Sequence, residues 1–207
     1  MANLIFYYGT MGSGKTTKLL QDHYNYRKDG HKIILMKPLL DTKGDDRVLN
    51  RMNESLRADL LIAPTESVIS DANLELLSDA KALLVDEAQF LNFNQVKELW
   101  LIAHVLNKSV SCYGLKSDFL GKPFEGTQAL LGYADRKNEL LVNCSCGEVA
   151  NFNARMVNGE FVMHGDVVAI DGKDNVSYVP LCSECYLNKV VQKNNDDVKV
   201  LKRVIRK

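Results

Sequence analysis

The chain has 207 residues, with 26 lysines and arginines balanced by 26 aspartates and glutamates, so its formal net charge is zero. This length accommodates one ordinary domain and a small additional one. A neutral chain has no broad electrostatic field that attracts nucleic acid or an anionic membrane, which counts against both as partners. There is no charged leader before an apolar core, and no apolar run approaches the roughly 20 residues that cross a bilayer. We therefore expect a soluble, cytoplasmic protein.

Apolar runs alternate with helical patterns up to about residue 140, which is typical of an α/β domain with a mainly parallel sheet. Strands are expected at residues 4–8, 33–37, 60–63, 82–86 and 110–115, and helices at 16–26, 65–77 and 94–106. Trp100 falls on the apolar face of the last helix, so we interpret it as core packing. The charged segment 39–57 is expected to be a mobile loop. Beyond residue 140, short strands, turns and cysteine pairs indicate a second unit.

The first strand leads into the run Gly9-Thr10-Met11-Gly12-Ser13-Gly14-Lys15-Thr16. This is the spacing G-x-x-x-x-G-K-[ST], in which backbone N–H groups and the start of a helix converge on phosphate oxygens. Lys15 is expected to reach the β- and γ-phosphates, and the hydroxyl of Thr16 to bind Mg²⁺. The sequence therefore predicts a site for a nucleoside triphosphate.

The predicted strand at residues 82–86 ends in two carboxylates, Asp86 and Glu87. Asp86 is expected to hold Mg²⁺ together with Thr16, and Glu87 to act as a general base. Such a glutamate activates either water, as in motors that hydrolyse ATP on nucleic acid, or a substrate hydroxyl. The string Asp-Glu-Ala-Gln that ends at Gln89 resembles the acidic box of nucleic-acid-translocating ATPases. Those motors generally need two such domains or a ring of subunits, so the length of this chain favours the hydroxyl.

Two close cysteine pairs, Cys144 with Cys146 and Cys182 with Cys185, are separated by a long loop. Four thiolates of this kind predict a tetrahedral Zn²⁺ site with no open position, and hence a structural role. The first pair is one residue shorter than the usual C-x-x-C, so its geometry is tighter. Cys112 lies within a predicted strand and is expected to be a buried apolar residue.

Four features occur in an order that resembles the cellular-type (type II) thymidine kinases. They are the P-loop with Met11, the Asp-Glu-Ala-Gln-Phe box, a Gly-Leu-x-x-Asp-Phe-x-Gly-x-Pro-Phe segment at residues 114–124, and the two cysteine pairs. The resemblance implies a RecA-like P-loop domain at residues 1–139, a zinc-binding lasso domain at 140–192 and a tail at 193–207. It also implies transfer of the γ-phosphate of ATP to the 5′-hydroxyl of thymidine, commonly in a homotetramer.

The resemblance also implies roles for single residues. Glu87 matches the proposed base, and the nucleotide site comprises residues 9–16 with Asp86, Gln89, Asp41 and Lys43. The residues implied to bind the thymidine are Met11, Leu115, Phe119, Phe124, Asn153 and Tyr178. Aromatic and apolar side chains near a phosphate site suit a flat base.

The chain departs from the family pattern at three places. Lys43 stands where an arginine is usual after Asp41, which replaces a bidentate grip by a point charge, with Arg47 and Arg51 as alternatives. Asn153 stands where threonine is common, and the Cys144–Cys146 spacing is short.

Two other functions stay open at this stage, a nucleic-acid-stimulated ATPase with a zinc module and a nucleotide-binding regulatory protein. The sequence also leaves open whether deoxyuridine is accepted, whether dTTP inhibits as an end product, and the number of subunits.

Overall fold

The structure is a computed structural model that describes residues 2–39, 46–49, 54–165 and 175–191. The chain forms two compact units. The first consists of Met1–Gly9, Gly14–Lys116 and Pro123–Leu140, and the second of Thr10–Ser13, Ser117–Lys122 and Leu141–Lys207. Two short segments that precede residue 140 therefore belong to the second unit. The tail predicted at 193–207 lies outside the described residues.

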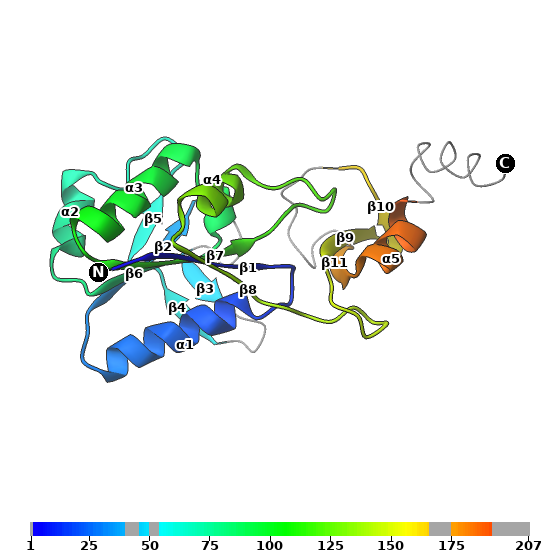
Figure 1. The fold of residues 1–207 in the computed structure, drawn as a ribbon, viewed down its shortest axis with the longest axis horizontal. Coiled ribbons are helices and arrows are strands. Elements are labelled where there is room, and N and C mark those ends of the chain that lie inside the picture. Colours follow the sequence, from blue (N-terminus) through cyan, green and yellow to red (C-terminus); the bar gives the residue numbers. More distant parts are fainter. Residues whose placement is uncertain (1, 40–45, 50–53, 166–174, 192–207) are drawn as a thin grey trace. The chain divides into compact units, whose positions relative to one another are not determined.

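A six-stranded sheet forms the centre of the first unit (Figure 1). Its strands are β1 (Leu4–Gly9), β2 (Ile33–Pro38), β5 (Leu60–Ile62), β6 (Ala82–Val85), β7 (Ser109–Leu115) and β8 (Arg136–Glu139). They lie in the order β5-β2-β6-β7-β1-β8, and every neighbouring pair is parallel. The predicted α/β fold with a mainly parallel sheet is thus confirmed.

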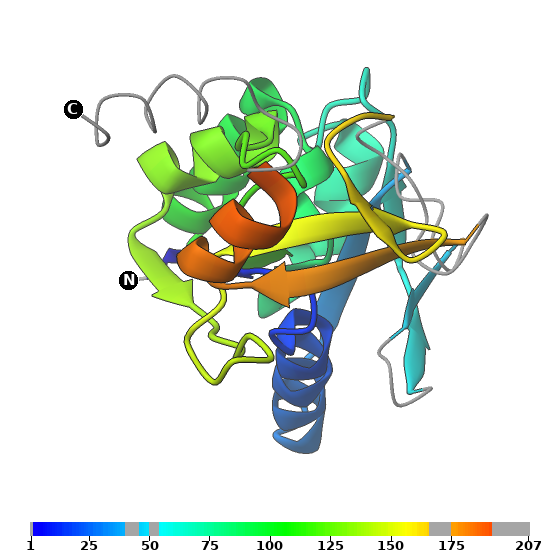
Figure 2. The same ribbon diagram turned by 90° about the vertical axis from the view of Figure 1, so that its right-hand side faces the viewer.

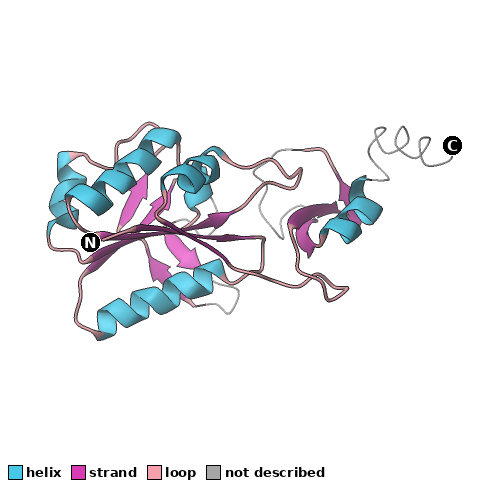
Figure 3. Cartoon of the chain, in the orientation of Figure 1, coloured by secondary structure: helices cyan, strands magenta, loops and turns pink. Residues whose placement is uncertain are grey.

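Helices cover both faces of this sheet, as its apolar central strands require (Figures 1 and 3). Helix α1 (Lys15–Lys28) lies on one face. Helices α2 (Asp71–Ser78), α3 (Phe93–Val105) and α4 (Glu125–Tyr133) lie on the other, and the short helical turn η1 (Ala88–Phe90) follows β6.

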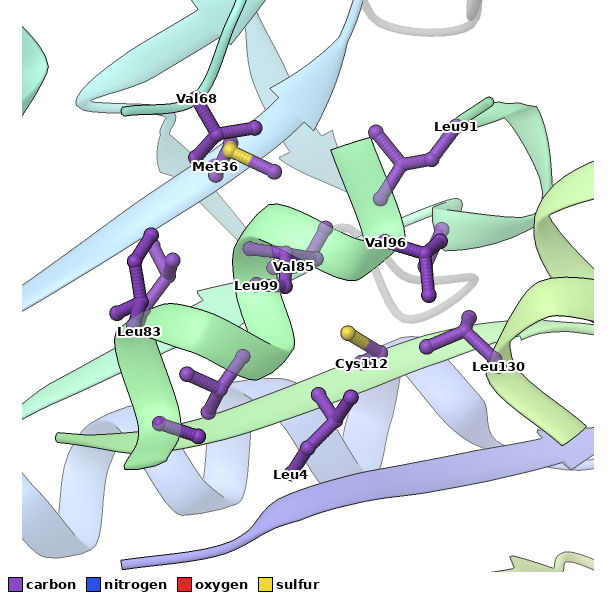
Figure 4. Close-up of a cluster of buried hydrophobic side chains, with 14 of the residues drawn as sticks. Leu4, Met36, Val68, Leu83, Val85, Leu91, Val96, Leu99, Cys112 and Leu130 are labelled. Atoms are coloured by element: carbon purple, nitrogen blue, oxygen red, sulfur yellow. The ribbon is translucent and has the colours of Figure 1, made fainter. Parts of the chain in front are cut away.

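The larger apolar core of the first unit lies between α3 and the sheet (Figure 4). Val96 and Leu99 of α3 are fully buried in the same cluster as Val85 and Cys112 of the strands. Burial raises the pKa of the Cys112 thiol, in keeping with its predicted role as an apolar residue. Trp100 packs against this cluster, which confirms its interpretation as a core residue.

The prediction of a helix from residue 65 was wrong, because α2 begins only at Asp71. Ser70 caps it by accepting a hydrogen bond from the backbone N–H of Asn73. The residues before it are held by α3: the Gln95 side chain donates to the carbonyl of Glu66, and the Glu98 carboxylate accepts from the Val68 N–H. These tertiary hydrogen bonds replace the first turn of the predicted helix.

The segment predicted as a loop at 39–57 contains two short strands among its described residues. These are β3 (Arg47–Leu49) and β4 (Ser55–Arg57), which pair in antiparallel fashion. Val48 is buried in the smaller core, and the buried ammonium of Lys37 donates to the carbonyl of Arg47. Apolar burial and this hydrogen bond give the segment a structure that its charged composition did not indicate.

The second unit contains a small antiparallel sheet, seen in yellow and orange in Figure 2. Its strands β9 (Phe152–Val157), β10 (Glu160–Val162) and β11 (Val176–Leu181) lie in the order β10-β9-β11 and precede α5 (Ser183–Tyr186) and η2 (Leu187–Val191). Its core includes Ala154, Leu181 and Tyr186. In neither unit does a described helix combine the length and apolar character that crossing a membrane requires.

Gly126 marks a close approach between α4 and η1. A Cβ at this position would lie 2.5 Å from the carbonyl oxygen of Ala88 and 2.7 Å from that of Leu91. Because backbone carbonyls cannot swing aside, Gly126→Ala should lower the free energy of unfolding by about 1–3 kcal/mol, measured by denaturant titration. Gly132→Ala in the same helix meets open space and should raise it by about 0.5–1 kcal/mol. Equal effects of the two substitutions would contradict this account.

Candidate active site

The carboxyl ends of β1, β6 and β7 meet at one edge of the parallel sheet. Strand β7 lies between the other two, with Val85 of β6 opposite Cys112, and Gly9 of β1 opposite Leu115. The acidic pair that follows β6 and the loop that follows β1 therefore leave the sheet on the same side. In open α/β sheets this is the edge at which ligands bind.

The loop after β1 has the backbone of a phosphate-binding turn. Gly12 and Gly14 have φ values of 80° and 82°, a left-handed conformation that glycine adopts without steric cost. Helix α1 starts directly afterwards at Lys15, with no side-chain cap on Gly14 and no acidic residue in its first turn. A helix N-terminus of this kind favours an anion, so the residues present fit a triphosphate.

The acidic pair continues directly from β6. Asp86 is buried, and its N–H donates to the carbonyl of Met36 in β2. Glu87 is partly exposed and adopts a left-handed conformation with φ 46° and ψ 39°, which is uncommon for a residue with a side chain. Its Oε2 accepts a hydrogen bond of 2.6 Å from Nε2 of Gln89. Among the described residues, Oε1 has no hydrogen-bond partner.

Two of the residues predicted to contact the base lie beside this turn in the first unit. Leu115 ends β7, and its N–H donates to Oε1 of Gln89 at 2.9 Å. The ring of Phe124 packs edge-on against Phe90 of η1, with centroids 5.7 Å apart. Both Leu115 and Phe124 are partly exposed, so apolar surface is available close to the Glu87 turn.

The other four predicted residues, Met11, Phe119, Asn153 and Tyr178, belong to the second unit. Hydrogen bonds within this unit engage the first three of them. The buried side chain of Asn153 accepts from the Met11 N–H at 2.7 Å and donates to the carbonyl of Ser117 at 3.1 Å. The carbonyl of Phe119 accepts from the hydroxyl of Tyr186 at 2.8 Å. The structure thus brings Met11, Asn153 and the 117–122 loop together through the sheet residue Asn153.

The environment of the Phe119 ring includes a residue that the sequence did not single out. The guanidinium carbon of Arg155 lies 5.3 Å from the ring centroid, an arrangement that allows a cation–π interaction. Arg155 is opposite Tyr178 in the pairing of β9 with β11. Nothing in the spacing of these residues along the chain signals this contact, because it depends on the pairing of two strands.

The four cysteines form a single cluster in the second unit. Their Sγ atoms all lie within 4.8 Å of one another, and those of Cys146 and Cys182 are 3.6 Å apart. Zn–S bonds of about 2.3 Å in a tetrahedron place the sulfurs at closely similar separations, so the cluster fits zinc. Hydrogen bonds from the backbone of Cys146 and Cys182 lower the pKa of Cys144, which favours the ligating thiolate. The short first pair is therefore compatible with the site.

The remaining predicted nucleotide contacts fall in the segment around β3 and β4, of which the structure describes residues 46–49 and 54–57. Asp41, Lys43 and the alternative Arg51 lie outside the described residues. Arg47 is described, and its guanidinium donates across the β3–β4 pair to Oγ of Ser55, from Nε at 3.1 Å and from Nη2 at 2.8 Å.

The family model and the relatives found by sequence agree on one family. The family model described as thymidine kinase matches residues 2–186. A thymidine kinase of Vibrio vulnificus (strain CMCP6) is 39% identical over 188 residues, which cover 90% of this chain and 97% of the relative. A thymidine kinase of Haemophilus influenzae (strain ATCC 51907 / DSM 11121 / KW20 / Rd) is 39% identical over 196 residues, 93% of this chain and 100% of the relative.

The likeness to solved structures is weaker. A crystal structure of Bacteroides Pif1 bound to ssDNA matches with a TM-score of 0.37 and 17% identity, covering 67% of this chain and 38% of that one. A match of this degree supports no conclusion about function.

Proposed function

Because the chain belongs to the thymidine kinase family, we propose that it transfers the γ-phosphate of ATP to the 5′-hydroxyl of thymidine, giving thymidine monophosphate and ADP for nucleotide salvage. The observation that carries the proposal is the Glu87 carboxylate at the edge where β1 also ends in its phosphate-binding loop. One of its oxygens is held by Gln89, and the other has no partner among the described residues.

In the proposed reaction Glu87 acts as the general base. It takes the proton of the 5′-hydroxyl while the hydroxyl oxygen forms a bond to the γ-phosphorus. The bond from that phosphorus to the β–γ bridging oxygen breaks, and its electron pair leaves with ADP. Lys15 and the N–H groups of the loop stabilise the charge on the phosphoryl group during transfer.

Magnesium would be held by the hydroxyl of Thr16 and, through water, by Asp86. It would supply positive charge to the phosphate oxygens of ATP. The burial of Asp86 directly after β6 supports this placement, since hard oxygen ligands at the end of a strand beside a P-loop suit this ion.

The thymine ring is proposed to bind to apolar and aromatic side chains, with polar groups giving its orientation. The residues proposed are Met11, Leu115, Phe119, Phe124, Asn153 and Tyr178. We further propose that structural zinc on the four cysteines orders the second unit, and that the protein acts in the cytoplasm as a homotetramer.

One assay tests the proposed function. The chain is incubated with labelled ATP and thymidine, deoxyuridine or other nucleosides, and then with DNA in place of the nucleoside. We expect labelled thymidine monophosphate and little release of free phosphate. Phosphate release that depends on DNA would favour a nucleic-acid-stimulated ATPase, and the absence of both products would contradict catalysis.

A further inference from the structure

Gln89 is a buried amide between the Glu87 carboxylate and the end of β7. The residue is only 2% exposed, and both polar ends of its side chain are hydrogen-bonded. Oε1 accepts from the backbone N–H of Leu115 at 2.9 Å, and Nε2 donates to Oε2 of Glu87 at 2.6 Å. A backbone N–H can only donate, so it requires the amide oxygen on the Leu115 side. The orientation that points the NH₂ group at the carboxylate is thereby determined.

Gly114 provides the space that this arrangement needs. A Cβ at position 114 would lie 2.9 Å from Oε1 of Gln89 and 3.1 Å from its backbone nitrogen. Contacts this short require the amide to move away from β7. The close packing of the Gln89 side chain on β7 therefore depends on a glycine one residue before Leu115.

The backbone of Glu87 adopts an uncommon conformation, so contacts around this residue must hold it in place. Its left-handed conformation, with φ 46°, is unfavourable for a residue with a side chain and persists where surrounding contacts impose it. The short hydrogen bond from Gln89 is the contact that reaches the carboxylate itself. It engages one oxygen and leaves Oε1 without a partner among the residues that the structure describes.

We propose that Gln89 is a positioning residue: it holds Oε2 of Glu87 so that Oε1 faces the hydroxyl to be phosphorylated, and it ties this carboxylate to the backbone of Leu115. The proposal rests on the proposed function and deepens it. It assigns Gln89 a role toward the general base Glu87, whereas the sequence analysis expected Gln89 to contact the nucleotide. Leu115 is also proposed to contact the thymine ring. The Gln89 amide therefore connects the general base Glu87 with a residue of the nucleoside site.

Two substitutions and one control variant test this role, each followed by steady-state kinetics with ATP and thymidine. Gln89→Met keeps the length of the side chain and removes both hydrogen bonds, and should lower kcat about 10- to 100-fold while the KM for ATP changes little. Gly114→Ala displaces the amide without deleting it and should lower kcat in the same direction. Gly132→Ala, which meets open space, is the matched control and should leave kcat unchanged.

Gln89→Glu is tested by the pH dependence of kcat/KM, which would not change if Gln89 had a purely structural role. Its carboxylate can still accept from the Leu115 N–H, but it places a second negative charge against Glu87. Two carboxylates at this separation share a proton, which raises the apparent pKa of the pair. The acidic limb of the kcat/KM profile should therefore move to higher pH by about one unit or more. Melting curves establish that each variant is folded.

The outcomes separate this role from the function on which it rests. A wild-type chain that forms no thymidine monophosphate overturns the proposed function and this role with it. An active wild type, with normal kcat in Gln89→Met and an unmoved profile in Gln89→Glu, overturns the positioning role alone. If Gln89→Met does not fold, the profile of Gln89→Glu decides.

Discussion

Replacing Glu87 by glutamine is expected to lower the turnover of thymidine about 10²- to 10⁴-fold while the affinity for ATP is largely retained. The substitution keeps the shape of the side chain, and its amide oxygen can still accept the hydrogen bond that Gln89 donates. What it removes is the ability to take a proton from the 5′-hydroxyl, and a loss of this size is typical of a general base. Turnover is measured as thymidine monophosphate formed, and ATP affinity by calorimetric titration.

The control for this substitution is Glu75→Gln on helix α2. Glu75 is exposed, so its loss of charge should leave turnover and ATP affinity unchanged. If Glu87→Gln turned over thymidine at nearly the normal rate, another group would have to accept the proton. If it lost ATP binding as well, Glu87 would have a role in nucleotide binding that the proposed mechanism does not include.

The second large effect is expected from Cys146→Ser. Cys146 is exposed and its sulfur lies against that of Cys182, so serine should remove a zinc ligand while disturbing little packing. We expect the zinc content to fall well below the value of about one per chain that a closed four-ligand site implies. It is measured by atomic absorption after gel filtration in metal-free buffer.

Loss of zinc should also weaken the binding of thymidine. Cys185 lies in α5 next to Tyr186, whose ring stacks on Phe152 and whose hydroxyl holds the carbonyl of Phe119. Releasing α5 should therefore loosen the Phe119 loop, and we expect the KM for thymidine to rise about tenfold or more.

Cys112→Ala is the matched control for the zinc experiment. Cys112 lies in β7 of the first unit, outside the cysteine cluster, and should be replaceable without loss of zinc. The Cys112→Ala substitution should only lower the free energy of unfolding, because it shortens a buried side chain. A Cys146→Ser chain that kept its full zinc content would contradict the four-cysteine site.

Much of the first unit could be predicted because its signals are local. The five strands predicted for the sheet were all found, and the helix predicted at 94–106 was observed as Phe93–Val105, with a capping box between Asn92 and Gln95 at its start. The sixth strand, β8, was missed because all of its residues are exposed and polar or charged. It is a strand at the edge of the sheet because it pairs with β1, and that pairing has no signature in its own residues.

For the candidate site, the sequence indicated the residue types but not their partners. The placement of Asn153 shows why: the sequence put it among the residues for the nucleoside, and that role stays a prediction. Its side chain hydrogen-bonds Met11, which is 142 residues away along the chain, and Ser117, which is 36 residues away. Contacts across such separations depend on how strands pair and loops pack.

The sequence by itself determined the glycine-rich loop after β1, the acidic pair after β6 and the two cysteine pairs, because each depends on the spacing of neighbouring residues along one strand, turn or helix. Tertiary structure alone decided that Gln89 lies between Glu87 and Leu115, that Gly114 and Gly126 must lack a side chain, and that the cysteine pairs converge. These depend on distances between segments far apart in the chain, which come into contact only when the strands pair and the apolar faces are buried.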